Sequence, residues 1–180
     1  MPLFVRPLLL AGVTLCAFAG APAYAETSVE ETADAAEEMF TVIVTGTRRN
    51  GRTVADSPVP IDVIVADNLA RSGFTETNRL LNEQLPSFNF PQPSITDGTD
   101  VVRPATLRGL GPDQTLVLIN GKRRHTASLL NINGSVGRGT SAVDINLIPS
   151  IALSRVEVLR DGAAAQYGSD AIAGVINFQL

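Results

Sequence analysis

The stretch that decides the fold closes the chain: "RVEVLRDGAAAQYGSDAIAGVINFQL", from Arg155 to Leu180. Alternating apolar residues predict a strand over Arg155 to Arg160. The residues that follow predict one or two helical turns, broken by Gly168 and Gly174. A mostly apolar strand, Val175 to Leu180, then ends the sequence without a polar tail. A bare apolar strand at the end of a chain raises the question of what it joins.

Upstream of this stretch, short elements alternate with turn formers. Val59 to Val65 alternates apolar and polar residues, which predicts a half-buried strand. Pro58 and Pro60 require either that this strand lies at a sheet edge or that the prolines stand at its first residues. Short helices are predicted at Ala66 to Gly73 and at Phe74 to Pro86, the second with Thr75 as its N-cap.

The middle of the chain predicts a hairpin between long loops. Leu116 to Ile119 is a continuous apolar run, typical of a strand covered on both faces. Asn120-Gly121 is a strong signal for a type I′ turn, after which Lys122 to His125 returns. The segments Ser87 to Pro104 and Thr126 to Pro149 are polar and rich in turn formers, which predicts loops. The fold class is α+β, a small mixed β-sheet with short helices and long loops.

The N-terminal 45 residues change character twice. Residues 1–25 have the layout of a cleaved signal peptide, with Arg6 before an apolar run and an A-x-A site at its end. Cys16 raises a lipoprotein alternative, although the preceding Leu15 is too large for a usual lipobox. Residues 26–39 form an acidic tail expected to be disordered. The next residues, Phe40 to Thr45, are uncharged, and all but Phe40 are β-branched. They are either the first strand of the domain or a segment that adds to a partner's sheet.

Composition excludes several kinds of chemistry. All 18 acidic residues follow residue 25, and the net charge of −4 argues against a nucleic-acid partner. With Cys16 removed and His125 the only histidine, a His/Cys zinc site is excluded. A G-x-G-x-x-A match at Gly137 to Ala142 lacks the following helix of a dinucleotide site. Ser169 and His125 are the only pair for a hydrolase, and Ser169 has no G-x-S-x-G setting. The sequence predicts no enzyme, no metal site and no cofactor.

Three charged residues stand beside glycines or on a predicted strand, namely Arg108, Glu157 and Arg160. Charges on a strand usually face water. Here they face either water or another polar wall, and the residues alone leave both alternatives open.

Three motifs, in this order and spacing, resemble one family. "RVEVLRDGAAAQYGSDAIAGVINF" is similar to the closing signature of the plug domain of TonB-dependent outer-membrane receptors. "ATLRGLGPDQTLVLINGKRR" resembles the central part of such plugs, and "FTVIVTGTRR" resembles their start, where the TonB box lies. The resemblance covers residues 40–180, which are expected to form the plug domain after the signal peptide and the acidic tail.

The resemblance implies a plug lodged in a β-barrel of the outer membrane. The partner TonB would pair with a TonB box at Thr41, Val42, Ile43, Val44 and Thr45, and would displace the plug to admit a scarce substrate. Such a substrate is an iron–siderophore complex, a cobalamin or a glycan. Arg108, Glu157 and Arg160 would pair with charges on the barrel wall. The loops toward substrate would hold Ser94, Asp97, Asp100, Asn131, Asn133 and Arg138.

The chain stops where the barrel of the family would begin. We therefore expect either the N-terminal fragment of a receptor or the product of a truncated gene. The alternative function is a free-standing periplasmic module that uses a plug fold for binding or signalling.

Overall fold

The computed structural model describes residues 42–43, 45–46, 52–92, 101–132 and 136–180 of the 180-residue chain. The expected signal peptide and acidic tail, residues 1–25 and 26–39, lie outside the described residues. The strands are β1 (Val42–Ile43), β2 (Arg52–Thr53), β3 (Ile61–Val65), β4 (Phe88–Asn89), β5 (Thr106–Leu107), β6 (Thr115–Ile119), β7 (Lys122–Arg123), β8 (Arg155–Leu159) and β9 (Gly174–Gln179). The helices are α2 (Ala66–Arg71), α3 (Thr77–Gln84) and α4 (Ala164–Tyr167), with 3-10 turns η1 (Pro112–Gln114), η2 (Ile145–Leu147), η3 (Ser150–Ala152) and η4 (Ser169–Ala171).

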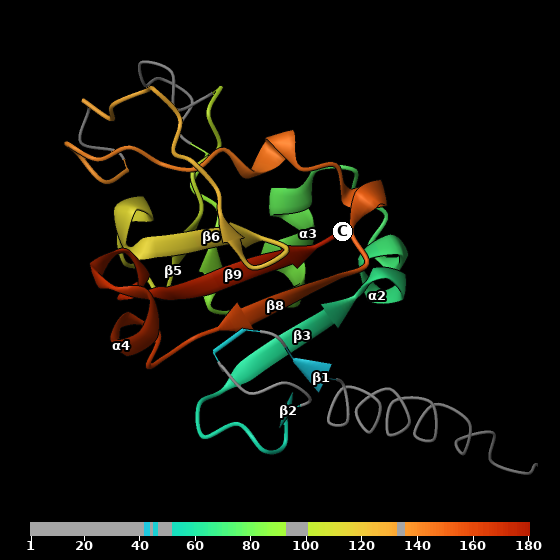
Figure 1. The fold of residues 1–180 in the computed structure, drawn as a ribbon. Coiled ribbons are helices and arrows are strands. Elements are labelled where there is room, and N and C mark those ends of the chain that lie inside the picture. Colours follow the sequence, from blue (N-terminus) through green and yellow to red (C-terminus); the bar gives the residue numbers. More distant parts are fainter. Residues whose placement is uncertain (1–41, 44, 47–51, 93–100, 133–135) are drawn as a thin grey trace, which may run out of the picture.

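A mixed five-stranded sheet organises the fold, with the strand order β3-β8-β9-β6-β7 (Figure 1). β6 and β9 run parallel, and the other neighbouring strands run antiparallel. The α+β class with a small mixed sheet is therefore confirmed. β3 lies at one edge of the sheet and begins at Ile61, so Pro58 and Pro60 precede the strand and the predicted start at Val59 is two residues too early.

The hairpin between β6 and β7 follows from two residues. Asn120 and Gly121 have φ of 48° and 77°, the left-handed region that both central positions of a type I′ turn require. The returning strand is shorter than expected, since β7 ends at Arg123 rather than His125.

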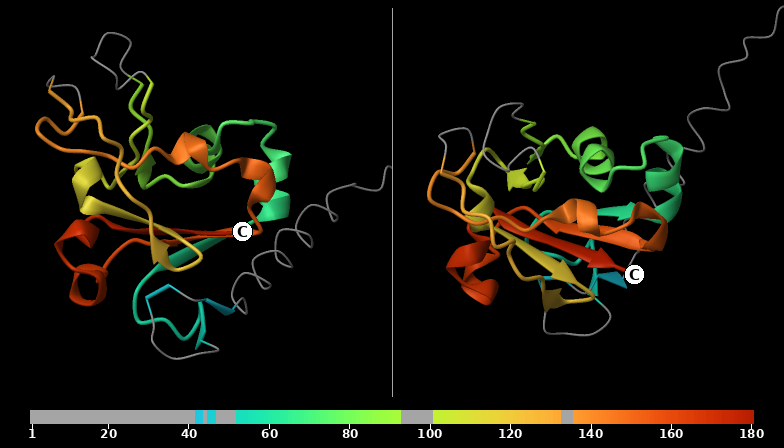
Figure 2. Two further views of the ribbon diagram at one scale, coloured as in Figure 1. Left: turned by 45° about the horizontal axis from the view of Figure 1, so that its top comes forward. Right: turned by 90° about the horizontal axis from the view of Figure 1, so that it is seen from above.

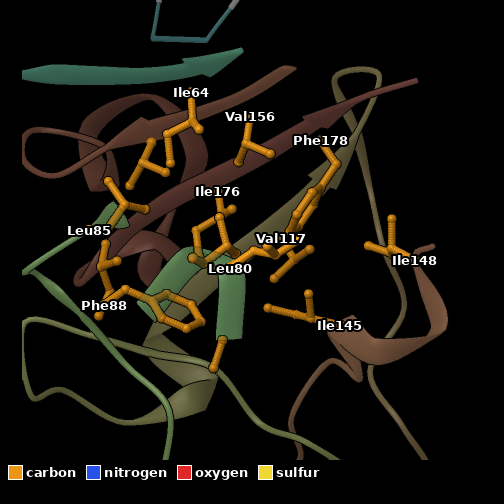
Figure 3. Close-up of a cluster of buried hydrophobic side chains, with 14 of the residues drawn as sticks. Ile64, Leu80, Leu85, Phe88, Val117, Ile145, Ile148, Val156, Ile176 and Phe178 are labelled. Carbon is orange, nitrogen blue, oxygen red and sulfur yellow. The ribbon is translucent and has the colours of Figure 1, made fainter. Parts of the chain in front are cut away.

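Each face of the sheet carries its own apolar core. α2 and α3 cover one face, whereas α4, β1 and β2 lie on the other (Figure 2). The larger core lies under the two helices, and Val117, Val156, Ile176 and Phe178 point into it from neighbouring strands (Figure 3). The smaller core, on the opposite face, contains Ile61, Val63, Leu116, Leu118, Leu159 and Val175. Strands buried on both faces hold the sheet in the centre of the domain.

Two local predictions are wrong in detail. Helix α3 begins at Thr77, and its N-cap is Glu76 without a side-chain cap, so Thr75 does not cap it. β3 is more buried than a half-exposed strand, because Ile64 enters the larger core while Ile61 and Val63 enter the smaller one. The covering elements on both faces, which local alternation cannot indicate, explain the difference.

Within the described residues, no helix has the length and apolar character needed to cross a membrane.

Candidate functional site

The segment expected to recognise a partner is docked on the sheet. Of its five residues, Thr41 and Val44 lie outside the described residues, while Val42 and Ile43 form β1 and pair antiparallel with β2. Thr45 is 1% exposed. Its N–H donates to Oε2 of Glu157 at 2.9 Å, and its hydroxyl donates to the same oxygen at 2.5 Å. The segment is therefore held at its C-terminal end by a side chain of β8.

Glu157 is the centre of a buried polar cluster. It is 0% exposed, and its Oε1 lies 3.0 Å from Nη2 of Arg155. Asn177, its neighbour on β9, is also 0% exposed and donates from Nδ2 to Oγ1 of Thr45 at 2.8 Å. Oδ1 of Asn177 in turn accepts from the N–H of Gly121 at 3.0 Å. A buried carboxylate needs such partners, because an unpaired buried charge is strongly destabilising.

The position of Glu157 corrects an expectation. The family resemblance implies a side chain that reaches a barrel wall, but Glu157 lies inside the domain beneath Thr45. Because side chains alternate along β8, Glu157 points to the face of the sheet opposite to that of Val156 and Val158. A strand with one face in water would show the same alternation of charged and apolar residues. Asn177 is a site residue that the sequence prediction lacks, and an asparagine within an apolar strand is the one signal that points to it.

Arg108 and Arg160 are partly exposed and lie next to each other. Nη1 of Arg108 donates to the carbonyl oxygen of Arg160 at 2.7 Å and lies 3.7 Å from Oδ1 of Asp161. Arg160 contacts Asp62 on β3 through two nitrogens, with Nη2–Oδ1 at 2.9 Å and Nε–Oδ2 at 2.8 Å. Both guanidinium groups keep part of their surface free for a further charged partner.

Asp62 and Arg160 also line a hollow of about 450 Å³ between β3 and α3. Burial raises the pKa of Asp62 above its ordinary value of 3.8, and the charge of Arg160 opposes this only in part. The folded chain therefore binds more protons than the unfolded chain in the window above pH 3.8. The contribution of Asp62 to stability is present below that window and is lost as the pH rises through the folded pKa.

Asp62→Asn tests the direction of this pH dependence. The free energy of unfolding of the unmodified chain should decrease relative to that of D62N as the pH rises from 3.8. Urea unfolding of both proteins across this range measures the difference. Arg160→Gln should make the dependence of the unmodified chain steeper, because it removes the charge that opposes the shift. A constant difference between the chain and D62N would contradict the prediction.

The loops expected to face substrate are only partly described. Ser94, Asp97, Asp100 and Asn133 lie outside the described residues. Arg138 is exposed, whereas Asn131 is 3% exposed, and its backbone closes the loop through Thr140 (N–O 2.9 Å). Asn131 is therefore buried and holds two parts of its loop together, and it does not face outward.

A hollow of about 640 Å³ lies beside these loops. Its lining includes Asn82, Asn89, Phe90, Thr106, Leu110 and Val136. The guanidinium of Arg103 lies 5.8 Å from the centre of the Phe90 ring, which is cation–π geometry. An aromatic ring, amides and a cation gather at this end of the domain, and the loops lie on the opposite side of the sheet from β1 and β2 (Figure 1).

The two residues considered for hydrolase chemistry lie at the surface. His125 and Ser169 are both exposed, and the Ser169 hydroxyl lies 3.4 Å from the carboxylate of its neighbour Asp170. Among the described residues, no group of three or more His, Cys, Asp or Glu side chains is placed to hold a metal ion.

Comparison with known proteins gives one consistent result. The family model described as TonB-dependent Receptor Plug Domain matches residues 53–175. The ferrienterobactin receptor of Escherichia coli is 30% identical over 76% of this chain and 18% of its own length. The hemin receptor of Yersinia enterocolitica is 28% identical over 96% of this chain and 22% of its own.

Solved structures agree with the sequence matches. A crystal structure of the ferric enterobactin receptor in complex with BCV-L6 superposes with a TM-score of 0.52 at 28% identity, covering 68% of this chain and 17% of the receptor. A variant of the Pseudomonas aeruginosa ferric enterobactin receptor gives a TM-score of 0.56 at 27% identity, covering 77% and 19%. The chain thus spans about a fifth of the length of these relatives.

Proposed function

The chain belongs to the TonB-dependent receptor plug domain family, and from this premise we propose that it is the gating plug of an active transporter. The plug would close the β-barrel of its own receptor in the outer membrane, after export directed by residues 1–25. A TonB protein in the periplasm would pair with residues 41–45 by strand addition and displace the plug. The relatives named for ferric enterobactin and hemin favour an iron-containing substrate over a cobalamin or a glycan.

The docking of residues 42–43 and 45–46 is the observation that carries this proposal. β1 belongs to a two-stranded ribbon, so within the described chain it pairs with β2 and with no further strand. A strand with an open edge can accept a partner strand through its backbone groups. Thr45 then joins this segment to the central strands of the sheet through Glu157 and Asn177. A partner that pulls on the segment therefore pulls on the middle of the plug.

The substrate would approach the opposite side of the domain. The loops around Arg138 and the hollow of about 640 Å³ lie there, with Asn82, Asn89 and Phe90 at its lining. Amide groups can bind the oxygen atoms of a metal chelate, and an aromatic ring can pack on its apolar parts. Substrate and partner would thus act on two different faces of one sheet.

Arg108 and Arg160 would face the barrel wall. Their side chains are 43% and 40% exposed and retain donors that can reach acidic groups of a surrounding wall. Exposed ion pairs contribute about 0–1 kcal/mol each. Contacts of this kind position the plug and still let it move.

Deletion of Thr41 to Thr45 tests the proposed partner segment. The full chain should bind the purified periplasmic domain of a TonB protein, and the deletion should abolish binding, because it removes the backbone groups that form the added strand. Isothermal titration calorimetry with the chain and the deletion variant measures this. Deletion of five residues of the acidic tail, Thr32 to Ala36, is the control of equal length. Equal binding by the deletion variant would place the partner segment elsewhere.

A further inference from the structure

The buried cluster of Thr45, Glu157 and Asn177 has a feature that the gating role alone does not require. The residues come from three segments, and Thr45 lies 112 positions from Glu157 and 132 from Asn177. All three are at most 1% exposed. The last residue of the proposed partner segment is therefore enclosed within the domain, while the strand just before it pairs only with β2 in the described chain.

Removal of Thr45 would change the surroundings of a buried charge. Thr45 supplies two hydrogen bonds to Oε2 of Glu157, and one of them, from the hydroxyl, is short at 2.5 Å. Hydrogen bonds to ionised groups are stronger than those between neutral groups. If the segment leaves, Glu157 loses both bonds to Thr45, whereas the contact of its Oε1 with Arg155 remains. The docked arrangement is thus favoured by the carboxylate and not only by the short β1–β2 ribbon.

The next residue extends the attachment. The N–H of Gly46 donates to Oη of Tyr167 at 3.1 Å, so α4 also contacts the segment. The Glu157 and Asn177 side chains occupy the face of the sheet that carries the smaller apolar core. In this face they replace apolar side chains at the place where the segment crosses it. The fold thus provides a specific receptor site for its own N-terminal segment.

We propose that Thr45, Glu157 and Asn177 form a latch that holds residues 42–43 and 45–46 on the sheet and sets how much of the segment is available to its partner. This rests on the proposed function for the partner, but the latch is a property of the chain alone. While the segment is docked, the open edge of β1 offers a partner only two residues, and the N–H of Thr45 is bonded to Glu157. Pairing through Thr45 as well therefore requires the segment to be free, and when only a fraction of molecules has it free, the apparent affinity of the partner is reduced by that fraction. Weakening the latch should therefore strengthen partner binding, even though it removes favourable contacts.

Two near-isosteric substitutions test the latch in the full chain. Thr45→Val removes the hydroxyl and keeps the backbone N–H, and Glu157→Gln removes the charge and keeps the shape. Amide hydrogen exchange followed by NMR reports on residues 45 and 46. We expect exchange there, corrected for the intrinsic rate of each residue type, to accelerate by about tenfold or more in both variants. The controls are Thr106→Val and Glu76→Gln, which alter a hydrogen bond and an ion pair elsewhere.

The same variants then decide whether the latch governs the partner. Titration with the TonB periplasmic domain should show tighter binding for T45V and E157Q by about the factor seen in exchange, with no change for the controls. Unchanged exchange at residues 45 and 46 in both variants would overturn the latch. Faster exchange with unchanged affinity would overturn its link to the partner. Absence of binding by every protein, the unmodified chain included, would contradict the proposed function, and hydrogen exchange would then decide by itself whether the latch exists.

Hydrogen exchange at amides of β6 and β9 shows whether a variant has destabilised the whole sheet rather than the latch alone. If E157Q also loses protection at Val117 and Ile176, the whole sheet has been destabilised in that variant. T45V, which leaves the carboxylate in place, then decides the outcome alone.

Discussion

Gly174→Ala should destabilise the chain more than any other single methyl group placed on its described glycines. Gly174 has φ of 143°, and a Cβ at this position would lie 2.4 Å from the carbonyl oxygen of Leu159 and 2.6 Å from Cδ2 of Leu107. The conformation is strained for any L-residue, at about 1–3 kcal/mol. Overpacking against a backbone atom adds roughly 1–3 kcal/mol. The expected loss of about 2–6 kcal/mol is a large part of the 5–15 kcal/mol that stabilises a typical domain.

Gly73→Ala is the matched control. Gly73 also has positive φ, 71°, but nothing lies within 4 Å of a Cβ built there. Only the backbone conformation is penalised in this variant, at about 1–2 kcal/mol. Urea unfolding of both variants, followed by circular dichroism, gives the two free energies. Similar losses at the two positions would show that the contact with Leu159 does not limit the fold.

Phe178→Ala should cost about 3–5 kcal/mol in the free energy of unfolding. Phe178 is 0% exposed and packs in the larger core, beside Val117 and Val156 (Figure 3). Truncation to alanine removes buried apolar surface and leaves a cavity, because the neighbouring strands are held in place by their hydrogen bonds and cannot close the space. The loss is therefore expected near the upper part of the range for core positions.

Phe74→Ala controls for the chemical change itself. Phe74 is 44% exposed and precedes α3, so its truncation should change the free energy of unfolding by about 0.5 kcal/mol or less. Chemical unfolding under identical conditions compares the two variants. A loss for F178A that is no larger than that for F74A would show that the larger core does not stabilise the domain in the way its packing indicates.

Gly174→Ala and Phe178→Ala both alter β9, the strand that connects the larger core with the candidate site. Ile176 and Phe178 point into the larger core, and between them Asn177 points to the opposite face and contacts Thr45. Alternation along one strand therefore joins the stability of the plug to the docking of its N-terminal segment. A change that displaces β9 is expected to loosen that segment as well.

The sequence by itself determined the elements whose causes are local. Asn120-Gly121 tolerates positive φ at both positions, and this required the type I′ turn that the structure contains. Pro60 stands directly before the first residue of β3, one of the two placements that its missing N–H allows, and the apolar run at Leu116 indicated a strand with two covered faces. These outcomes depend on backbone sterics and on side chains within a few residues. The family resemblance, confirmed by the match over residues 53–175, rests on motifs of the same local kind.

Only the tertiary structure decided the role of Glu157. Its strand places it between two valines of the opposite face, a pattern that equally fits a charge exposed to water. It is buried because Thr45, 112 positions away, covers it and supplies two hydrogen bonds, and because Asn177 lies beside it on β9. Whether a charged side chain is solvated or enclosed depends on what packs over it. That covering element is brought there by the whole sheet, so no pattern within β8 could have indicated it.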